Sequence, residues 1–384
     1  MRSECIVLSV ANHKGGVGKT STAINLACAF AGTRRRVLLI DLDPQGSATV
    51  SILRKRPTGL ISSGNALMSE ASLVPCIKPY NLAKFDLVPA NDDLTAFCVS
   101  CINEEGKEFR LKNALSSLRL IYDLIIIDCP PALNLLTINA LCASDDLIIP
   151  TTCDYFAVDG LSSLLRLFEK LKTDGMSNVR LMGIVRTLYS LGEPLAKKIS
   201  EDLKSNLGTL LFNTIIPYTS LISEAPSMGR PVILYDRSCL GSRAYLSLAG
   251  EILKRMEQNR LTQAPAAEAQ EPDANSAQAA TAAQEPDANQ APDAYQEPEV
   301  NQAPAPAPEQ STAADSDDDY LSDDDLPDYA EPRTNSLIGN RPQKAAIAAP
   351  QDAASAVTTD APTAPPPADV AAATEAVANN NLPQ

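Results

Sequence analysis

A glycine-rich turn directly after a short apolar run constrains this chain more than any other feature. Residues 14–20 read Lys-Gly-Gly-Val-Gly-Lys-Thr and follow the apolar run Cys5–Ala11. A strand that leads through such a turn into a helix aims several backbone N–H groups at one anion. The pattern therefore predicts a phosphate-binding loop, in which Lys19 contacts the β- and γ-phosphates of a nucleotide and the Thr20 hydroxyl binds Mg²⁺.

This loop departs from the usual Gly-x-x-x-x-Gly-Lys-[Ser/Thr] pattern at two positions. Ala11 stands where the first glycine belongs, and Lys14 is a second lysine inside the loop. One lysine is sufficient for a phosphate-binding loop. Lys14 therefore needs a separate role.

Charge divides the chain into two unlike parts. Of 32 Lys and Arg and 47 Asp and Glu, 29 and 25 lie in residues 1–260 and 3 and 22 in residues 261–384, so the net charges are +4 and −19. The second part is rich in Ala, Pro and Gln and has too few large apolar residues to offset its ordering entropy. We expect one folded α/β domain over residues 1–260 and a disordered acidic tail over residues 261–384.

The cysteines and the hydropathy bear on the compartment. The nine cysteines are scattered, and a pattern of this kind without a signal peptide is typical of reduced, buried thiols. The isolated pair Cys98 and Cys101 is interpreted as packing rather than as a zinc site. No apolar stretch approaches the roughly 20 residues of a membrane span. We expect a cytoplasmic protein with no integral membrane segment.

Apolar, β-branched runs alternate with helical patterns along the first 260 residues. Strands are predicted at Cys5–Ala11, Val37–Asp41, Phe85–Pro89, Leu124–Asp128, Leu147–Pro150, Leu181–Arg186 and Thr214–Pro217. Helices are predicted at Lys19–Ala31, Lys112–Leu120, Leu133–Ala143, Asp159–Asp174, Pro194–Asn206 and Ser242–Gln258. Continuous runs such as Leu124–Ile127 indicate strands buried on both faces.

The alternation predicts a doubly wound α/β fold with a mostly parallel sheet, as in P-loop NTPase domains. Ligands of such sheets bind at the carboxyl ends of the strands. The P-loop, Asp41–Asp43 and Asp128 all follow or end predicted strands. We therefore expect them to converge at one edge of the sheet.

Four segments in this order resemble the ParA/Soj family of deviant Walker-A ATPases, whose relatives include the cell-division regulator MinD. They are ANHKGGVGKTSTAINLA (11–27), VLLIDLDPQGSAT (37–49), YDLIIIDCPP (122–131) and SEAPSMGRPV (223–232). The resemblance covers roughly residues 5–258. It implies ATP and Mg²⁺ as cofactors, hydrolysis of ATP to ADP and phosphate, and an ATP-dependent homodimer.

The resemblance also implies catalytic roles. Lys14 matches the family's signature lysine, which reaches across the dimer interface to the phosphates of the partner's ATP. A cation from each protomer would offset the charge of the two nucleotides and make dimerisation depend on ATP. Lys19 matches the P-loop lysine, and Asp43 matches the residue that orients the attacking water.

The predicted binding residues extend beyond these three. The predicted nucleotide contacts are Lys14, Gly15, Gly16, Val17, Gly18, Lys19, Thr20, Ser21, Asp43, Pro217 and Thr219. The predicted metal-binding residues are Thr20, Asp41 and Asp128, with Asp128 as the Walker-B carboxylate. Pro217 matches a family position beside the adenine.

Two functions stay open after the resemblance. In the first, the chain is a chromosome or plasmid partition ATPase that binds non-specific DNA at the nucleoid, with slow hydrolysis stimulated by a ParB-type partner. In the second, the same switch positions another cargo, such as a membrane, an organelle or a secretion complex. A third class, the iron–sulfur carriers related to nitrogenase reductase, needs cysteines at the dimer face, where this chain has only Cys129 near Asp128.

Departures from the family weaken the DNA interpretation. Relatives often carry arginines and an asparagine just after the position of Pro217, whereas here Tyr218 to Leu221 read Tyr-Thr-Ser-Leu. A basic face could still form from Arg230, Arg237, Arg243, Lys254 and Arg255. The acidic tail could compete with DNA for that face.

The two C-terminal segments have alternative interpretations. The apolar stripe of Ser242–Gln258 suits packing against the sheet better than a membrane anchor. In the tail, the acidic block Asp315–Tyr329 is interrupted by Tyr and Leu side chains. This block could bind a further protein partner or imitate the charge of nucleic acid.

Overall fold

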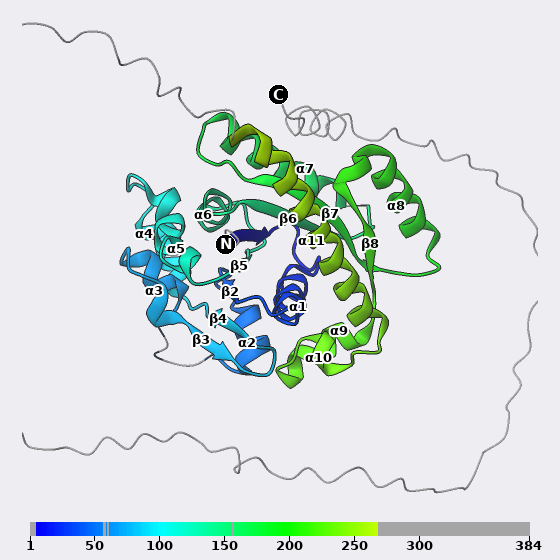
Figure 1. Ribbon diagram of the computed structural model, residues 1–384, viewed down its shortest axis with the longest axis horizontal. Helices are drawn as coiled ribbons and strands as arrows, with labels where there is room; N and C mark the ends of the chain where they lie inside the picture. The colour runs from blue at the N-terminus through cyan, green and yellow to red at the C-terminus, as the bar shows by residue number, and fades with distance from the viewer. Residues whose placement is uncertain (1–4, 57–58, 60, 156, 268–384) are drawn as a thin grey trace, which may run out of the picture. The chain divides into compact units, whose positions relative to one another are not determined.

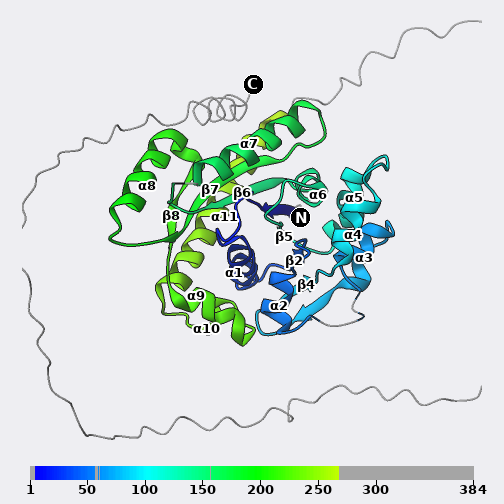
Figure 2. The ribbon, with the colours of Figure 1, turned by 180° about the vertical axis from the view of Figure 1, so that it is seen from behind.

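The fold is a mostly parallel sheet covered by helices on both faces (Figures 1 and 2). The computed structural model describes residues 5–56, 59, 61–155 and 157–267. The predicted acidic tail, including Asp315–Tyr329, lies outside the described residues from position 268 onward. The doubly wound architecture predicted from the sequence is confirmed.

The sheet has eight strands in the order β3-β4-β2-β5-β1-β6-β7-β8. All neighbours are parallel except β3, which runs antiparallel to β4 at one edge. The strands are β1 (Ile6–Val10), β2 (Val37–Asp41), β3 (Lys78–Tyr80), β4 (Phe85–Val88), β5 (Leu124–Asp128), β6 (Asp146–Thr151), β7 (Arg180–Tyr189) and β8 (Leu211–Pro217).

Helices of very different length connect the strands. They are α1 (Lys19–Ala31), α2 (Ser47–Leu53), α3 (Ser63–Met68), α4 (Asp93–Ser100), α5 (Arg110–Leu115), α6 (Leu135–Ala143), α7 (Ala157–Thr173), α8 (Pro194–Leu207), α9 (Ser220–Glu224), α10 (Val232–Tyr235) and α11 (Leu240–Ala267). Short 3₁₀ turns are η1 (Val74–Cys76), η2 (Lys107–Phe109), η3 (Leu118–Leu120), η4 (Gly208–Leu210) and η5 (Ala225–Met228).

Alternate side chains of the central strands enter separate cores on the two faces. Leu8 and Val10 of β1 share one apolar cluster with side chains of α1 and α11, which pack side by side. Val7 belongs to the cluster on the opposite face, with side chains of α6 and α7. Burial on both faces is the physical reason for the unbroken apolar runs in these strands.

Two predicted helices differ from the structure. Lys112–Leu120 is divided, because α5 ends at Leu115 and a separate turn, η3, follows. The Ser116 hydroxyl donates to the Asn113 carbonyl at 2.8 Å, a local bond that competes with continued helix. At the other end of the chain, α11 continues to Ala267, so the predicted domain boundary at residue 260 falls inside it.

The apolar stripe on α11 packs into the core of the domain, as predicted from the sequence. Tyr245, Leu248 and Ile252 are at most 1% exposed and belong to the core shared with α1. No helix among the described residues is long and apolar enough to cross a membrane. The interpretation of Ser242–Gln258 as a packed helix is confirmed.

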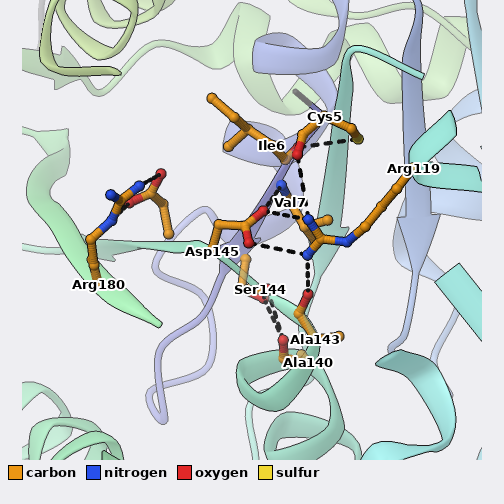
Figure 3. Close-up of polar contacts among 11 residues, drawn as sticks. Cys5, Ile6, Val7, Arg119, Ala140, Ala143, Ser144, Asp145 and Arg180 are labelled. Carbon is orange, nitrogen blue, oxygen red and sulfur yellow. Dashed lines mark hydrogen bonds and ion pairs between the residues drawn. The ribbon is translucent and has the colours of Figure 1, made fainter. Parts of the chain in front are cut away.

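Two ion pairs lie at the amino ends of the strands, at the edge opposite the P-loop (Figure 3). Arg119 donates to both oxygens of Asp145 at 2.9 and 3.1 Å, and the Val7 backbone N–H donates to the same carboxylate at 2.7 Å. Arg180 of β7 pairs at 3.0 Å with Asp146, which is fully buried. These contacts lie near the first residues of β1, β6 and β7, and the sequence pattern did not indicate them.

Candidate functional site

Three neighbouring strands bring the predicted site residues together. In the register of the sheet, Asp128 at the end of β5 lies opposite Val10 of β1 on one side and Asp41 of β2 on the other. The P-loop follows β1 directly, and α1 begins at Lys19. The loop, Asp41–Asp43 and Asp128 therefore converge at one edge, as expected from parallel strands.

The loop adopts the geometry of an anion cradle. Gly16 and Gly18 have φ angles of 72° and 78°, in the left-handed region where a side chain would be strained. Thr20 and Ser21 lie in the first turn of α1, whose free N–H groups carry the positive end of the helix dipole. The structure places Gly15 and the buried Val17 within the same turn.

Lys19 is a buried cation beside the carboxylates. The residue is 6% exposed, and its Nζ donates to the Lys14 carbonyl at 2.9 Å. Burial lowers the pKa of Lys19, and the charge of Asp128 partly offsets this shift. A phosphate group at the loop would supply the counter-charge that this ammonium lacks.

Lys14 lies on the other side of the loop, toward the segment that joins β6 to α7. Its Nζ donates to Asp154 at 2.5 Å and to the Thr152 hydroxyl at 3.3 Å. Its backbone N–H donates to the Asn12 side chain at 3.0 Å. The structure thus separates the two lysines of the loop, with Lys19 facing the carboxylates of the sheet and Lys14 facing an acid on its own chain.

Asp41 holds the shape of the segment that carries Asp43. It is fully buried, and one oxygen accepts bonds from the Thr49 N–H and hydroxyl, both at 2.7 Å. The other oxygen accepts from the Asp43 N–H at 3.2 Å. Burial raises the pKa of Asp41 to about 6 despite these bonds. The contacts indicate a positioning role, and the metal contact predicted for Asp41 stays a prediction.

Asp43 begins a tight turn at the edge of the site. It is 7% exposed, and its carboxylate accepts from the Gln45 N–H at 2.9 Å. The Gly46 N–H donates to the Asp43 carbonyl at 2.7 Å, and Gly46 has a φ of 64°. One carboxylate oxygen thus fixes the turn.

Asp128 is an unsatisfied carboxylate at the centre of this edge. It is fully buried, and neither of its oxygens has a hydrogen-bond partner in the described part of the chain. Burial and the neighbouring Asp41 raise its pKa well above the usual range. The Thr20 hydroxyl lies near this carboxylate without completing a well-aligned hydrogen bond, and together with Lys19 it only partly reverses the shift. A hydrated Mg²⁺ supplies both the charge and the donors that such a carboxylate lacks. The residues present fit this ion.

We expect Asp128→Asn to stabilise the metal-free protein by about 1–3 kcal/mol near neutral pH. The wild-type carboxyl has a raised pKa in the folded state and about 3.9 in the unfolded state, so wild-type stability falls as pH rises above 4. Asparagine carries no charge, so its advantage should be near zero below pH 4 and should grow with pH. Urea unfolding in EDTA across this range tests the expectation.

The exposed Asp174 offers a matched control for this substitution. Asp174→Asn removes the same charge from the turn after α7 and should leave stability within about 0.5 kcal/mol at every pH. A pH-independent advantage of Asp128→Asn, or a loss of stability, would contradict an unpaired buried carboxylate.

The predicted adenine contacts lie farther along the sheet. Pro217 ends β8, three strands from β1 in the order of the sheet. Thr219 caps α9, where its hydroxyl oxygen accepts from the Leu221 N–H at 3.3 Å. Their contact with a nucleotide stays a prediction.

The structure assigns supporting roles to residues that the sequence did not indicate. The Thr187 hydroxyl, on β7, lies 2.8 Å from the Val17 carbonyl and 3.1 Å from the Thr151 carbonyl. It ties the P-loop to two strands beyond β1. The Asn12 amide donates to the Pro150 carbonyl at 2.7 Å and fixes the start of the loop. Neither residue belongs to a sequence pattern that reveals such contacts.

The predicted basic face needs one correction. Arg230, Arg237, Arg243 and Lys254 are exposed, but Arg255 is not part of that surface. Its guanidinium lies 4.0 Å from the centroid of the Phe212 ring and donates to the Met182 carbonyl at 2.8 Å. Arg255 therefore packs α11 against β7 and β8, because its long side chain finds backbone acceptors there.

Comparisons with known proteins agree on one family. A protein-family model described as an AAA domain (AAA_31) matches residues 5–181. The chromosome partitioning protein ParA of Caulobacter vibrioides is 39% identical over 251 residues, which is 65% of this chain and 94% of that protein. The sporulation initiation inhibitor protein Soj of Bacillus subtilis is 37% identical over 246 residues, covering 64% of this chain and 97% of Soj.

A solved structure supports the same fold and identifies ligands in that relative. It is cobyrinic acid a,c-diamide synthase from Mycobacterium smegmatis with a bound ATP analogue and magnesium. It is 31% identical, has a TM-score of 0.58, and is matched over 66% of this chain and 97% of its own.

Proposed function

We propose that this chain, which belongs to the ParA/Soj family of partition ATPases, is an ATP-dependent dimerising switch in chromosome or plasmid partition. It binds ATP and Mg²⁺, as the chemistry of the P-loop and Asp128 supports. The observation that carries the proposal is the separation of the two loop lysines. Lys19 faces the carboxylates of its own site, whereas Lys14 faces away from them.

The residues of one protomer can perform most of the chemistry. Lys19 and the N–H groups of the loop would bind the β- and γ-phosphates. Thr20 and Asp128 would hold Mg²⁺, which would supply positive charge beside those phosphates. Asp43 orients a water for attack on the γ-phosphate. The Asp41 carboxylate accepts bonds from Thr49 and from the Asp43 N–H, and these bonds hold the segment that carries the Asp43 carboxylate in place.

Lys14, the second cation of the loop, makes ATP-dependent dimerisation require a second protomer. Lys14 from each chain would contact the phosphates bound by the other, so a dimer forms only where nucleotide supplies the negative charge. Hydrolysis removes the γ-phosphate and with it part of this attraction. A ParB-type partner that speeds hydrolysis would then return the protein to monomers.

The solved structure with an ATP analogue comes from an enzyme named as an amide synthase. Both sequence relatives described above have higher identity and are named for chromosome partition or sporulation control. That structure therefore supports only the binding of ATP and magnesium.

Cys129 is 1% exposed, and burial raises the pKa of its thiol. This burial argues against the iron–sulfur carriers, since these present cysteines at a surface.

For the partition function, we expect ATP-dependent binding to random-sequence DNA. Affinity should fall steeply between about 50 and 200 mM salt, because lysine and arginine contacts to phosphate release counterions. Removing residues 268–384, with their net negative charge, should tighten binding severalfold, because the tail no longer competes for the basic face. Fluorescence anisotropy with ATP, with ADP and without nucleotide measures both effects.

A second function is favoured by the surface after β8. Tyr218 is 64% exposed where relatives often carry basic residues. If neither the full chain nor the truncated chain binds DNA with ATP in a salt-dependent way, the proposal that this ATPase binds DNA at the nucleoid is wrong. The same ATP switch would then position a cargo other than DNA.

A further inference from the structure

The signature lysine is already engaged within its own chain. Nζ of Lys14 lies 2.5 Å from both carboxylate oxygens of Asp154 and 3.3 Å from the Thr152 hydroxyl. The Thr152 hydroxyl also donates to Asp154 at 2.8 Å, so the three groups form one small network. The ammonium of Lys14 therefore directs its hydrogens to acceptors on the same protomer.

The backbone around this network fits the lysine closely. Asn12 links the two segments, because its amide donates to the Pro150 carbonyl and its oxygen accepts from the Lys14 N–H. On the other side, a Cβ added to Gly160 in α7 would lie 3.1 Å from Lys14 Cβ. The absence of a side chain at Gly160 lets the start of α7 approach the loop. The segment from β6 to α7 thus forms a seat for Lys14.

A lysine in this seat is not available to a second protomer. Its three N–H donors are directed at Asp154 and Thr152, whereas a trans contact requires them to face the partner's phosphates. The pair is accessible to solvent, since the side chains of Lys14 and Asp154 are 27% and 46% exposed. A partly exposed ion pair is weak enough to exchange for a phosphate group with more negative charge.

We propose that Asp154, assisted by Thr152, is a latch that holds Lys14 in the monomer. The latch raises the protein concentration at which the chain dimerises in the presence of ATP. The proposal rests on the trans role of Lys14 in the proposed function. Each protomer exchanges one intramolecular ion pair for an intermolecular contact. Asp154 is thus a positioning residue that opposes dimerisation, rather than a catalytic residue.

The size of the effect follows from the exposure of the pair. Losing an exposed ion pair of this kind changes an equilibrium by about three- to fivefold. Both protomers must release their lysine, so the factors multiply to about tenfold or more in the dimer dissociation constant. We expect Asp154→Asn to lower that constant in ATP by about this factor, and Thr152→Val to lower it by less.

The experiment uses the full chain with Asp43→Ala, so that ATP is not consumed during the measurement. Sedimentation velocity at saturating ATP and Mg²⁺ gives the dimer dissociation constant with and without Asp154→Asn. Asp174→Asn, an equal change of charge at an exposed site, should leave the constant unchanged. Without nucleotide, every variant should remain monomeric.

A second readout follows Lys14 in the monomer itself. Asp154→Asn should increase the rate at which an amine-acylating reagent labels Lys14 without nucleotide, measured by mass spectrometry, whereas Asp174→Asn should not. An unchanged labelling rate means that Asp154 does not hold the lysine. Weaker or unchanged dimerisation of Asp154→Asn in ATP, or its dimerisation without nucleotide, also overturns the latch.

Lys14→Ala separates failure of the latch from failure of the proposed function. If Lys14→Ala abolishes dimerisation but Asp154→Asn does not strengthen it, the latch alone is wrong. If Lys14→Ala dimerises normally with ATP, the trans role of Lys14 is wrong, and the latch proposal, which rests on that role, is wrong as well.

Discussion

Lys14→Ala is expected to abolish ATP-dependent dimerisation while leaving ATP binding to the monomer within a few fold of wild type. The reason is the position of the side chain, since Nζ of Lys14 is directed away from the carboxylates of its own site and bonds Asp154. Without this cation, the negative charge of the two nucleotides would not be offset at the interface of the proposed dimer. Light scattering gives the mass, and a fluorescent ATP analogue gives the affinity of the monomer.

Lys19→Ala is the matched control, because it removes the other lysine of the same loop. Lys19 is buried beside Asp128 and donates to the loop carbonyl of Lys14, so its loss should abolish nucleotide binding itself. The two variants therefore fail at different steps. Equal loss of monomer binding in both would show that Lys14 acts within its own site.

Asp43→Ala is expected to lower ATP hydrolysis by about 10²–10³-fold and to accumulate the ATP-bound dimer. In the proposed mechanism this carboxylate orients the attacking water, so its loss should slow hydrolysis far more than it weakens nucleotide binding. Its other role is local, because it accepts from the Gln45 N–H at 2.9 Å. Phosphate release under multiple turnover and the dimer fraction over time measure the two effects.

Asp43→Asn distinguishes chemistry from local structure. Asparagine keeps an oxygen that can accept from the Gln45 N–H but lacks the negative charge. Hydrolysis should stay low in both variants if the charge orients the water. Recovery of hydrolysis in Asp43→Asn would mean that Asp43 acts only by shaping the turn before Gly46.

The sequence predicted the central sheet and the edge where the site lies because these features leave strong patterns. Strands buried on both faces give continuous apolar runs such as Leu124–Ile127, and a phosphate loop needs glycines at fixed spacing. The convergence of Asp41, Asp43 and Asp128 followed from the rule that parallel strands end together. Each of these signals is local or repeats along the chain.

The parts that were not predicted depend on contacts between distant segments. The short strand β3 and the five-residue helix α9 have too few residues for a clear period. Arg255 reads as a surface cation, and only the packed chain reveals its bonds to Met182 and its contact with Phe212. The pairing of Lys14 with Asp154 spans 140 positions, and no pattern at either residue indicates the other.

The shared ATP site is tested most directly by the mass of two variants measured side by side. Sedimentation of Asp43→Ala and of the double variant Lys14→Ala/Asp43→Ala is compared with ATP and Mg²⁺ and with ADP and Mg²⁺. We expect a dimer for Asp43→Ala with ATP, and monomers in the other three samples. A double variant that dimerises with ATP, or an Asp43→Ala chain that stays monomeric with ATP, would contradict the shared site.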